Sequence, residues 1–519
     1  MTSDRSSSLH DVVIIGSGFG GSMVARELVH AGRSVCMVER GDWVRRGPHN
    51  WAPDGSVDLT RHYSLETPYR VRNGRSEKVV GLYTCVGGPS VFYGGVSLRF
   101  READFQPPVE LTGGSGALWP IHYPDLEPYY RRAEELLGVA GKEGEDPTEP
   151  YRSSPYPQRP PPLSGTSRMI AEAARGLGLR PFHLPLAIRF GRNGGRTPAC
   201  VRCTTCDTFA CAVQAKNDLA TTVLPELVER GMGLLPNTVV IRLEREAERI
   251  AAAVCVNRIT GERRVVRGHR FVLAAGALGT PHLLLASRLE RRNPGGWVVG
   301  RHLMRHRNAI VFGVFPRAPD TVGEFHKQIG IHDFYFGDAD RRAPRGKLGA
   351  IQQVQTPPIG LVREHLPDAL SSFLSPRVDY LAGLLVMAED QPQAGNRLAV
   401  DPGRQDRFGL PSAVISHRYS PRDLAAGRVL ARKARRILRE AGALFFYVHR
   451  IETFSHAVGT VRMGEDPATS ALDEHCRFRG VENLWVVDGS FMPSSAGLNP
   501  SLTIAANALR VGERLVGHG

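Results

Sequence analysis

The sequence predicts an α/β protein with more than one lobe, and three observations support this fold class. Its 519 residues exceed what one hydrophobic core usually serves. Residues 11–39 alternate an apolar run, a glycine-rich turn, a helical pattern and a second apolar run. Residues 484–506 repeat the order of strand, turn and helix near the C-terminus.

The first unit has the pattern of a dinucleotide-binding fold. After a predicted parallel strand at residues 11–15, Gly16 permits a tight turn and Gly18 lets the backbone approach a pyrophosphate. Gly21 lets helix and strand pack closely, and the phosphates then lie at the helix N-terminus. Glu39 ends the second strand, where a carboxylate accepts hydrogen bonds from ribose hydroxyls. This unit predicts dinucleotide binding without separating NAD from FAD.

The second unit can hold another part of the same nucleotide. A predicted strand at residues 484–487 ends in Asp488 and Gly489. A loop ending in Asn499 and Pro500 then opens a predicted helix. This places an acidic strand end beside a helix N-terminus.

Together these segments resemble the glucose-methanol-choline (GMC) oxidoreductases, and other segments agree. Residues 87–95 resemble the family's glycine-rich loop beside the flavin, and residues 274–281 are similar to its second signature. Residues 456–464 look like the family's catalytic segment. The resemblance implies FAD, held by Gly16, Gly18, Phe19, Gly21, Glu39, Gly88, Ser90, Tyr93, Gly94, Val239, Ala275, Gly276, Asp488, Gly489, Asn499, Pro500 and Thr503.

The resemblance also implies two lobes. A discontinuous, Rossmann-like FAD-binding domain is expected at residues 9–110, 216–309 and 446–519. A substrate-binding domain with a mostly antiparallel sheet is expected at residues 111–215 and 310–445.

In this family a histidine and a second histidine or asparagine face the flavin, and the matching positions are His456 and Asn499. His456 is expected to take the hydroxyl proton of an alcohol while flavin N5 accepts the hydride. Asn499 would donate a hydrogen bond to the substrate oxygen, although asparagine at this position could also cap the helix. Other histidines, such as His306, are expected to be structural or at the pocket edge.

The predicted activity is oxidation of a small-molecule alcohol to an aldehyde or ketone, with a dehydrogenase favoured over an oxidase. Sugars, amino sugars, sterols and simple alcohols remain open as substrates, and oxygen, a quinone or a redox protein as electron acceptors. Alternatives are a lyase or decarboxylase on the same scaffold, or a flavin and iron–sulfur electron carrier. An NAD-dependent enzyme would not need the unit at Asp488 and Gly489.

Four of the eight cysteines are concentrated within twelve positions. Such thiolates can ligate an iron–sulfur cluster or zinc. The spacing matches neither a bacterial ferredoxin nor the usual zinc pattern, so structural cysteines, an iron–sulfur cluster and zinc all remain open. A cluster would favour a dehydrogenase. These residues are Cys200, Cys203, Cys206 and Cys211.

The chain carries 66 Lys and Arg against 52 Asp and Glu, a net charge of +14. The arginines are scattered and no nucleic-acid motif accompanies them, so no nucleic-acid partner is expected. The densest basic run, residues 432–439, is expected to be a solvated helix face. No signal segment is predicted, because residues 1–10 are polar. No transmembrane helix is predicted either, because the longest apolar stretch, residues 271–287, contains glycines and a proline. A cytoplasmic location is expected.

Overall fold

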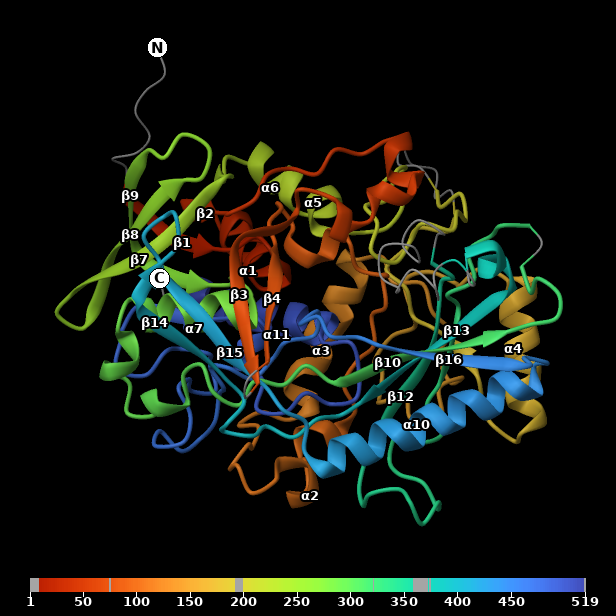
Figure 1. Cartoon of the computed structure of the whole chain (residues 1–519). Coiled ribbons are helices and arrows are strands. Elements are labelled where there is room, and N and C mark those ends of the chain that lie inside the picture. The colour runs from red at the N-terminus through yellow and green to blue at the C-terminus, as the bar shows by residue number, and fades with distance from the viewer. Residues whose placement is uncertain are drawn as a thin grey trace.

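The computed structural model describes residues 9–73, 76–191, 199–320, 322–357, 372 and 375–517. Their strands form three sheets, and Figure 1 shows helices covering the two larger ones. Among these residues no helix is long and apolar enough to cross a bilayer.

The first sheet carries the glycine-rich unit. Strand β1 pairs in parallel with β2 and β9, and β17 extends the parallel part beside β9. Val13 and Ile14 in β1 are fully buried, as expected for a parallel strand covered on both faces. The order is β6-β2-β1-β9-β8-β7, with β17 beside β9. The strands are β1 (Leu9–Ile15), β2 (Val35–Val38), β6 (Gly233–Leu235), β7 (Thr238–Glu246), β8 (Arg249–Asn257), β9 (Arg263–Leu273) and β17 (Leu484–Val486).

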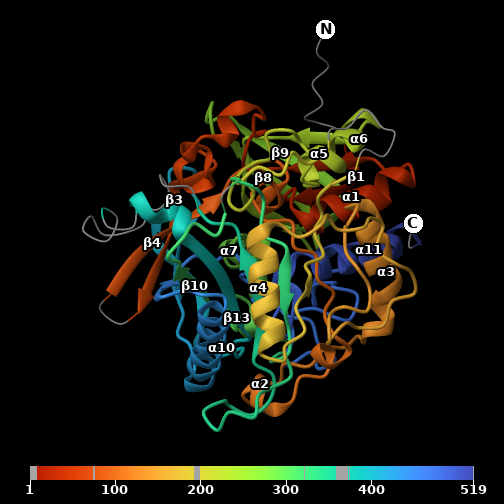
Figure 2. The same cartoon turned by 90° about the vertical axis from the view of Figure 1, so that its right-hand side faces the viewer.

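Helices from distant parts of the sequence pack together beside this sheet. Helix α1 (Phe19–His30) contacts α11 (Ser501–Gly517), and α11 contacts α3 (Tyr123–Leu136), as Figures 1 and 2 show. The start of α1 and the start of α11 therefore belong to one layer. The remaining α-helices described outside the second sheet are α2 (Val109–Thr112), α5 (Leu219–Thr222), α6 (Leu224–Glu229) and α7 (Gly276–Ala286).

The second sheet is antiparallel and contains most of the strands of the expected substrate-binding domain. Helices α4 (Gly165–Gly176) and α10 (Pro421–Glu440) contact each other, and their apolar residues share one core with the strands (Figure 2). The order is β16-β10-β13-β12-β11-β5. The strands are β5 (Phe182–His183), β10 (Arg307–Val314), β11 (Ile329–Ile331), β12 (Gly349–Val354), β13 (Leu381–Ala388) and β16 (Phe445–Arg450).

A third, smaller sheet joins the two expected domains. Strands β3 (Tyr63–Asn73) and β4 (Ser76–Tyr83) come from the N-terminal part, whereas β14 (Arg397–Gln405) and β15 (Pro411–Ser416) come from the expected substrate domain. Strand β15 pairs in parallel with β3. The domain boundaries therefore stay a prediction, since this sheet crosses them.

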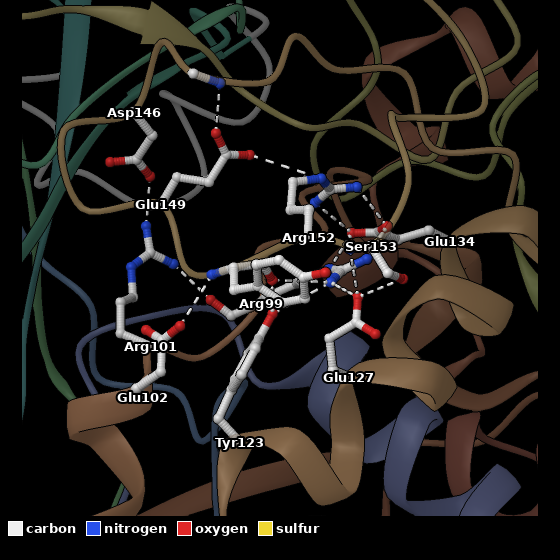
Figure 3. Close-up of polar contacts among 12 residues, drawn as sticks. Arg99, Arg101, Glu102, Tyr123, Glu127, Glu134, Asp146, Glu149, Arg152 and Ser153 are labelled. Carbon is white, nitrogen blue, oxygen red and sulfur yellow. Dashed lines mark hydrogen bonds and ion pairs between the residues drawn. The ribbon is translucent and has the colours of Figure 1, made fainter.

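A buried network of ion pairs fixes the proline-rich segment, residues 149–162, against helix α3 (Figure 3). Arg99 donates to both oxygens of Glu134, at 2.9 and 2.7 Å, and to Glu127 at 3.0 Å. Arg152 donates to the same Glu134 oxygens at 3.0 and 2.6 Å. Each of these four charges has a partner of opposite sign, which buried charges require.

Candidate active site

A cavity of about 550 Å³ lies between the first sheet and the second sheet. Its walls come from the turn between β1 and α1, the loop at residues 88–94, the turn between β9 and α7, the segment around His456 and the start of α11. The structure thus brings together the segments that the sequence singled out. The predicted site residues that line it are Gly16, Gly18, Phe19, Glu39, Gly88, Tyr93, Gly94, Ala275, Gly276, His456, Asp488, Gly489, Asn499 and Pro500.

Glycines at the β1–α1 turn have two different physical roles. A Cβ on Gly16 would lie 2.3 Å from the Ala274 carbonyl oxygen, and one on Gly21 would lie 2.0 Å from the Gly16 oxygen. Gly20, which no motif marked, would place a Cβ 2.5 Å from the Val487 oxygen. At these three positions close packing of the backbone requires glycine.

Gly18 differs, because a Cβ there would meet nothing within 4 Å. The fold therefore leaves space at Gly18, on the cavity side of the turn. Gly18 is also the N-cap of α1 and makes no side-chain cap, so the first N–H groups of the helix are available. An open space beside uncapped N–H groups fits a pyrophosphate.

Two carboxylates organise the walls of this cavity. Glu39 accepts from the Ser17 backbone at 3.0 Å, from Ser17 Oγ at 2.7 Å and from the Gly41 backbone at 2.8 Å. A carboxylate has about four acceptor positions, so Glu39 keeps capacity for a ribose hydroxyl. Arg40 also lines the cavity and carried no sequence signal.

Asp488 joins the turn that follows β17 to the start of α7. It accepts from the Gly276 backbone at 3.0 Å, from Thr280 Oγ1 at 2.5 Å and from the Ser490 backbone at 2.9 Å. Burial raises the pKa of Asp488 above its ordinary value. Asp488 therefore holds the β9–α7 turn against the C-terminal strand.

Four predicted cofactor residues do not line the cavity. Gly21 packs α1, and Ser90 Oγ donates to the Gly87 oxygen at 2.7 Å. Thr503 shares a 2.8 Å hydrogen bond with the Tyr130 hydroxyl. Val239 is buried, while its neighbours Thr238 and Val240 line the cavity in its place.

His456 and Asn499 meet at the cavity wall. His456 Nε2 lies 3.5 Å from Asn499 Nδ2, and His456 Nδ1 lies 3.2 Å from Nδ1 of His306. Asn499 Oδ1 is buried without a hydrogen-bond partner among the described residues, so Asn499 does not cap α11 through its side chain. Burial lowers the pKa of His456 to about 3, and the positive charge of Lys327 acts in the same direction. The His456 ring is therefore neutral at pH 7, and its Nε2 atom, on the side of Asn499, can accept a proton.

Another part of the cavity wall comes from the second sheet. Ile310, Leu385 and Gln352 form one row across three neighbouring strands. Asn308, on the same strand as Ile310, also lines the cavity. The oxygens Asn308 Oδ1 and Gln352 Oε1 are buried and have no partner among the described residues. This wall offers apolar contact flanked by free hydrogen-bond acceptors.

An ion pair between Lys327 and Asp207 also faces the cavity. A Cβ on Gly94 would lie 2.0 Å from both Asp207 Oδ1 and Lys327 Nζ. Glycine at position 94 therefore makes room for this ion pair beside the glycine-rich loop. No sequence motif marked the pair, because its members come from distant segments.

The cysteine segment forms part of the wall through Thr204, Asp207 and Thr208. All four cysteines are free. Burial raises the pKa of Cys200 to about 11 and of Cys206 to about 12.

Within the described ranges, no group of three or more His, Cys, Asp or Glu side chains could hold a metal ion. The predicted cluster at Cys200, Cys203, Cys206 and Cys211 thus receives no support from this arrangement. Lys216 Nζ anchors the segment by donating to the Tyr93, Cys206 and Phe209 carbonyls, at 2.7, 3.0 and 2.7 Å.

Comparison with known proteins agrees with this geometry. The N-terminal and C-terminal profiles of the GMC oxidoreductases match residues 11–308 and 392–508. The chain belongs to the GMC oxidoreductase family. It is an FAD-binding oxidoreductase that acts on alcohol groups, which confirms the predicted cofactor and reaction class.

Two curated relatives and one solved structure align with almost the whole length of this chain. Paromamine 6'-oxidase of Streptomyces fradiae is 33% identical, covering 98% of this chain and 91% of that protein. The 6'''-hydroxyparomomycin C oxidase of Streptomyces lividus is 32% identical, with 100% and 92% covered. Pyridoxine 4-oxidase from Mesorbium loti shares the fold, with a TM-score of 0.68 at 19% identity, covering 97% of this chain and 99% of that one. The predicted two-lobed α/β fold is confirmed.

Proposed function

We propose that His456 is the base that takes the hydroxyl proton of the substrate and that Asn499 holds the substrate oxygen. One observation carries this proposal: His456 Nε2 and Asn499 Nδ2 lie 3.5 Å apart at the wall of the cavity that also contains Gly18 and Glu39. A hydroxyl oxygen in contact with both groups would lose its proton to Nε2 and receive a hydrogen bond from Nδ2. FAD, when bound, supplies the hydride acceptor.

The substrate we propose is a hydroxyl-rich alcohol. The unpartnered oxygens Asn308 Oδ1 and Gln352 Oε1 need donors, because a buried acceptor without one costs about 1–3 kcal/mol. Hydroxyl and ammonium groups are such donors. The apolar row containing Ile310 and Leu385 would meet the C–H face of a ring. The aminoglycosides in the names of two relatives fit this description and are the first substrates to test.

The experiment is a substrate panel with product analysis. Purified enzyme loaded with FAD is mixed with paromamine, a hexose, a sterol and a simple primary alcohol, and the aldehyde or ketone is identified by mass spectrometry. We expect turnover of the hydroxyl-rich compounds. Turnover of the sterol alone would contradict the proposed substrate class. Release of a product with the flavin still oxidised under anaerobic conditions would instead indicate a lyase.

The electron acceptor is tested in the same preparation. The prediction of a dehydrogenase depended on a metal cluster at the cysteine segment, and the described residues show no such arrangement. Oxygen consumption compared with reduction of an added quinone distinguishes an oxidase from a dehydrogenase.

The cytoplasmic location remains a separate prediction, which fractionation of the source cells would test.

A further inference from the structure

A second buried histidine, His306, lies directly behind His456. The segment before β10 runs antiparallel to the segment after His456, since Met304 and Val458 exchange backbone hydrogen bonds of 3.0 and 2.9 Å. His306 follows Met304 by two residues and His456 precedes Val458 by two, so the antiparallel pairing places the two histidines opposite each other. The two Nδ1 atoms are 3.2 Å apart, and the rings are inclined at 80°. The pairing of the two segments therefore sets the pairing of the two rings.

The surroundings of His306 decide which of its nitrogens carries the proton. Its Nε2 lies 3.1 Å from the Ser495 carbonyl oxygen. A carbonyl can only accept, so Nε2 of His306 is the protonated nitrogen. A neutral imidazole has one N–H, which leaves Nδ1 of His306 as an acceptor facing His456.

The tautomer of His456 follows from that of His306. Because Nδ1 of His306 accepts, Nδ1 of His456 must carry the proton that is donated across the 3.2 Å contact. Nε2 of His456 is left with its lone pair, directed at Asn499 Nδ2 and the cavity. The Asn499 amide nitrogen can only donate, which agrees with an acceptor at Nε2.

We propose that His306 is a positioning residue that holds His456 in the tautomer with a free Nε2. This inference rests on the proposed function, in which Nε2 takes the hydroxyl proton. After that transfer, the protonated His456 keeps its Nδ1 hydrogen bond to His306, so the contact is present before and after the proton moves.

Hydrogen bonds to Asp390 fix the backbone of His306 and its surroundings. Asp390 Oδ1 accepts from the His306 backbone at 3.0 Å and from Ser495 Oγ at 2.9 Å. Asp390 Oδ2 accepts from the Arg305 backbone at 2.8 Å. One buried carboxylate thus fixes both the backbone of His306 and the residue whose carbonyl orients its ring. His306 also has a left-handed backbone, with φ of 60°, which for a non-glycine residue persists only when its surroundings enforce it.

His302 supplies a matched control within the same segment. It is buried, has the same φ of 60°, and its Nδ1 lies 2.9 Å from the Pro392 carbonyl oxygen. This hydrogen bond joins the ring of His302 to a backbone carbonyl, whereas Nδ1 of His306 faces Nδ1 of His456. A histidine that only stabilises this segment should therefore behave like His302.

The first test compares three variants of the FAD-loaded enzyme. We expect His306→Ala to lower the limiting rate of flavin reduction by about 10–100-fold, by analogy with the loss of a partner that orients a metal-binding histidine. FAD content and the substrate KM should stay unchanged. His306→Asn should recover most of the rate, because its carbonyl oxygen can accept from His456 and asparagine tolerates a left-handed backbone. His302→Ala should react at the normal rate.

The second test observes the tautomer without turnover. Solid-state ¹⁵N spectra of ring-labelled histidine in the substrate-free protein, with the His456→Asn spectrum subtracted, report which ring nitrogen of His456 is protonated. We expect the proton on Nδ1 in the wild type and a shift toward Nε2 in His306→Ala. A wild-type His456 protonated on Nε2, or a normal rate in His306→Ala, would overturn the inference. A normal rate in His456→Asn would overturn the proposed function instead, leaving the tautomer to the spectra.

Discussion

At the scale of single residues, the enclosure of His456 determines how the reaction responds to pH. Burial lowers its pKa to about 3, and the positive charge of Lys327 adds to this shift. The neutral ring is the active base, so its contribution is lost only as the pH falls through that lowered pKa. We therefore expect flavin reduction, followed by anaerobic stopped flow, to keep its rate from about pH 8 to about pH 5. An acid limb centred near the ordinary histidine pKa of about 6.5 would contradict this.

Two neighbouring glycines allow packing to be separated from cofactor binding. Gly18→Ala adds a Cβ where the protein leaves space, so the apoprotein should unfold at the normal temperature while its FAD affinity falls. Gly20→Ala forces a Cβ to 2.5 Å from the Val487 oxygen, which we expect to destabilise the fold by about 1–3 kcal/mol. Thermal unfolding of the apoprotein and FAD titration measure the two effects. Equal losses of stability in both variants would argue against a cofactor role for Gly18.

Residue motifs predicted the nucleotide half of the site more completely than the substrate half. Gly16, Glu39 and Asp488 stand in local patterns whose chemistry can be inferred from spacing. His306 and Gln352 stand in no such pattern. The place of His306 behind His456 and that of Gln352 at the cavity depend on which segments pair and in which register. Long-range pairing of this kind leaves no local signal.

At the scale of elements, the ion-pair network around α3 gives a direct test of stability. Glu134 is buried and binds both Arg99 and Arg152, so Glu134→Gln leaves two buried cations short of a carboxylate (Figure 3). We expect a loss of about 3–5 kcal/mol in the free energy of unfolding, measured with urea. Its neighbour Glu135 pairs with Arg131 at the surface, and Glu135→Gln should change stability by less than about 1 kcal/mol. Equal effects of the two substitutions would show that the network does not stabilise the fold.

Elements with strong local signals were predicted well. A serine followed three residues later by an acidic residue is a local signal for the start of a helix. Ser420 and Asp423 form such a capping box at the start of α10, with Ser420 Oγ accepting from the Asp423 backbone at 3.2 Å. The third sheet was not predicted, because β3 and β15 are more than 300 residues apart and their pairing depends on the whole fold.

Part of the basic run on α10 is paired, since Arg432 and Lys433 contact Asp340 and Asp338.

At the scale of the whole molecule, the cavity joins a nucleotide half to a substrate half. The second sheet supplies Gln352, whose oxygen has no partner among the described residues. Gln352→Met keeps a similar volume and removes that acceptor. We expect KM to rise by about tenfold for a hydroxyl-rich alcohol, roughly 1.4 kcal/mol, and to stay unchanged for a simple primary alcohol. A parallel change for both alcohols would mean that the substitution disturbs the site rather than one contact.

The central claim is that His456 removes the substrate proton in an FAD-dependent oxidation. The most direct measurement is anaerobic mixing of FAD-loaded wild type and His456→Asn with an alcohol that the wild type oxidises, recording the loss of flavin absorbance. We expect the variant to retain FAD and to reduce it about 10²–10⁴-fold more slowly, the range of a positioned general base. Equal rates in the two proteins, with equal FAD content, would contradict the account.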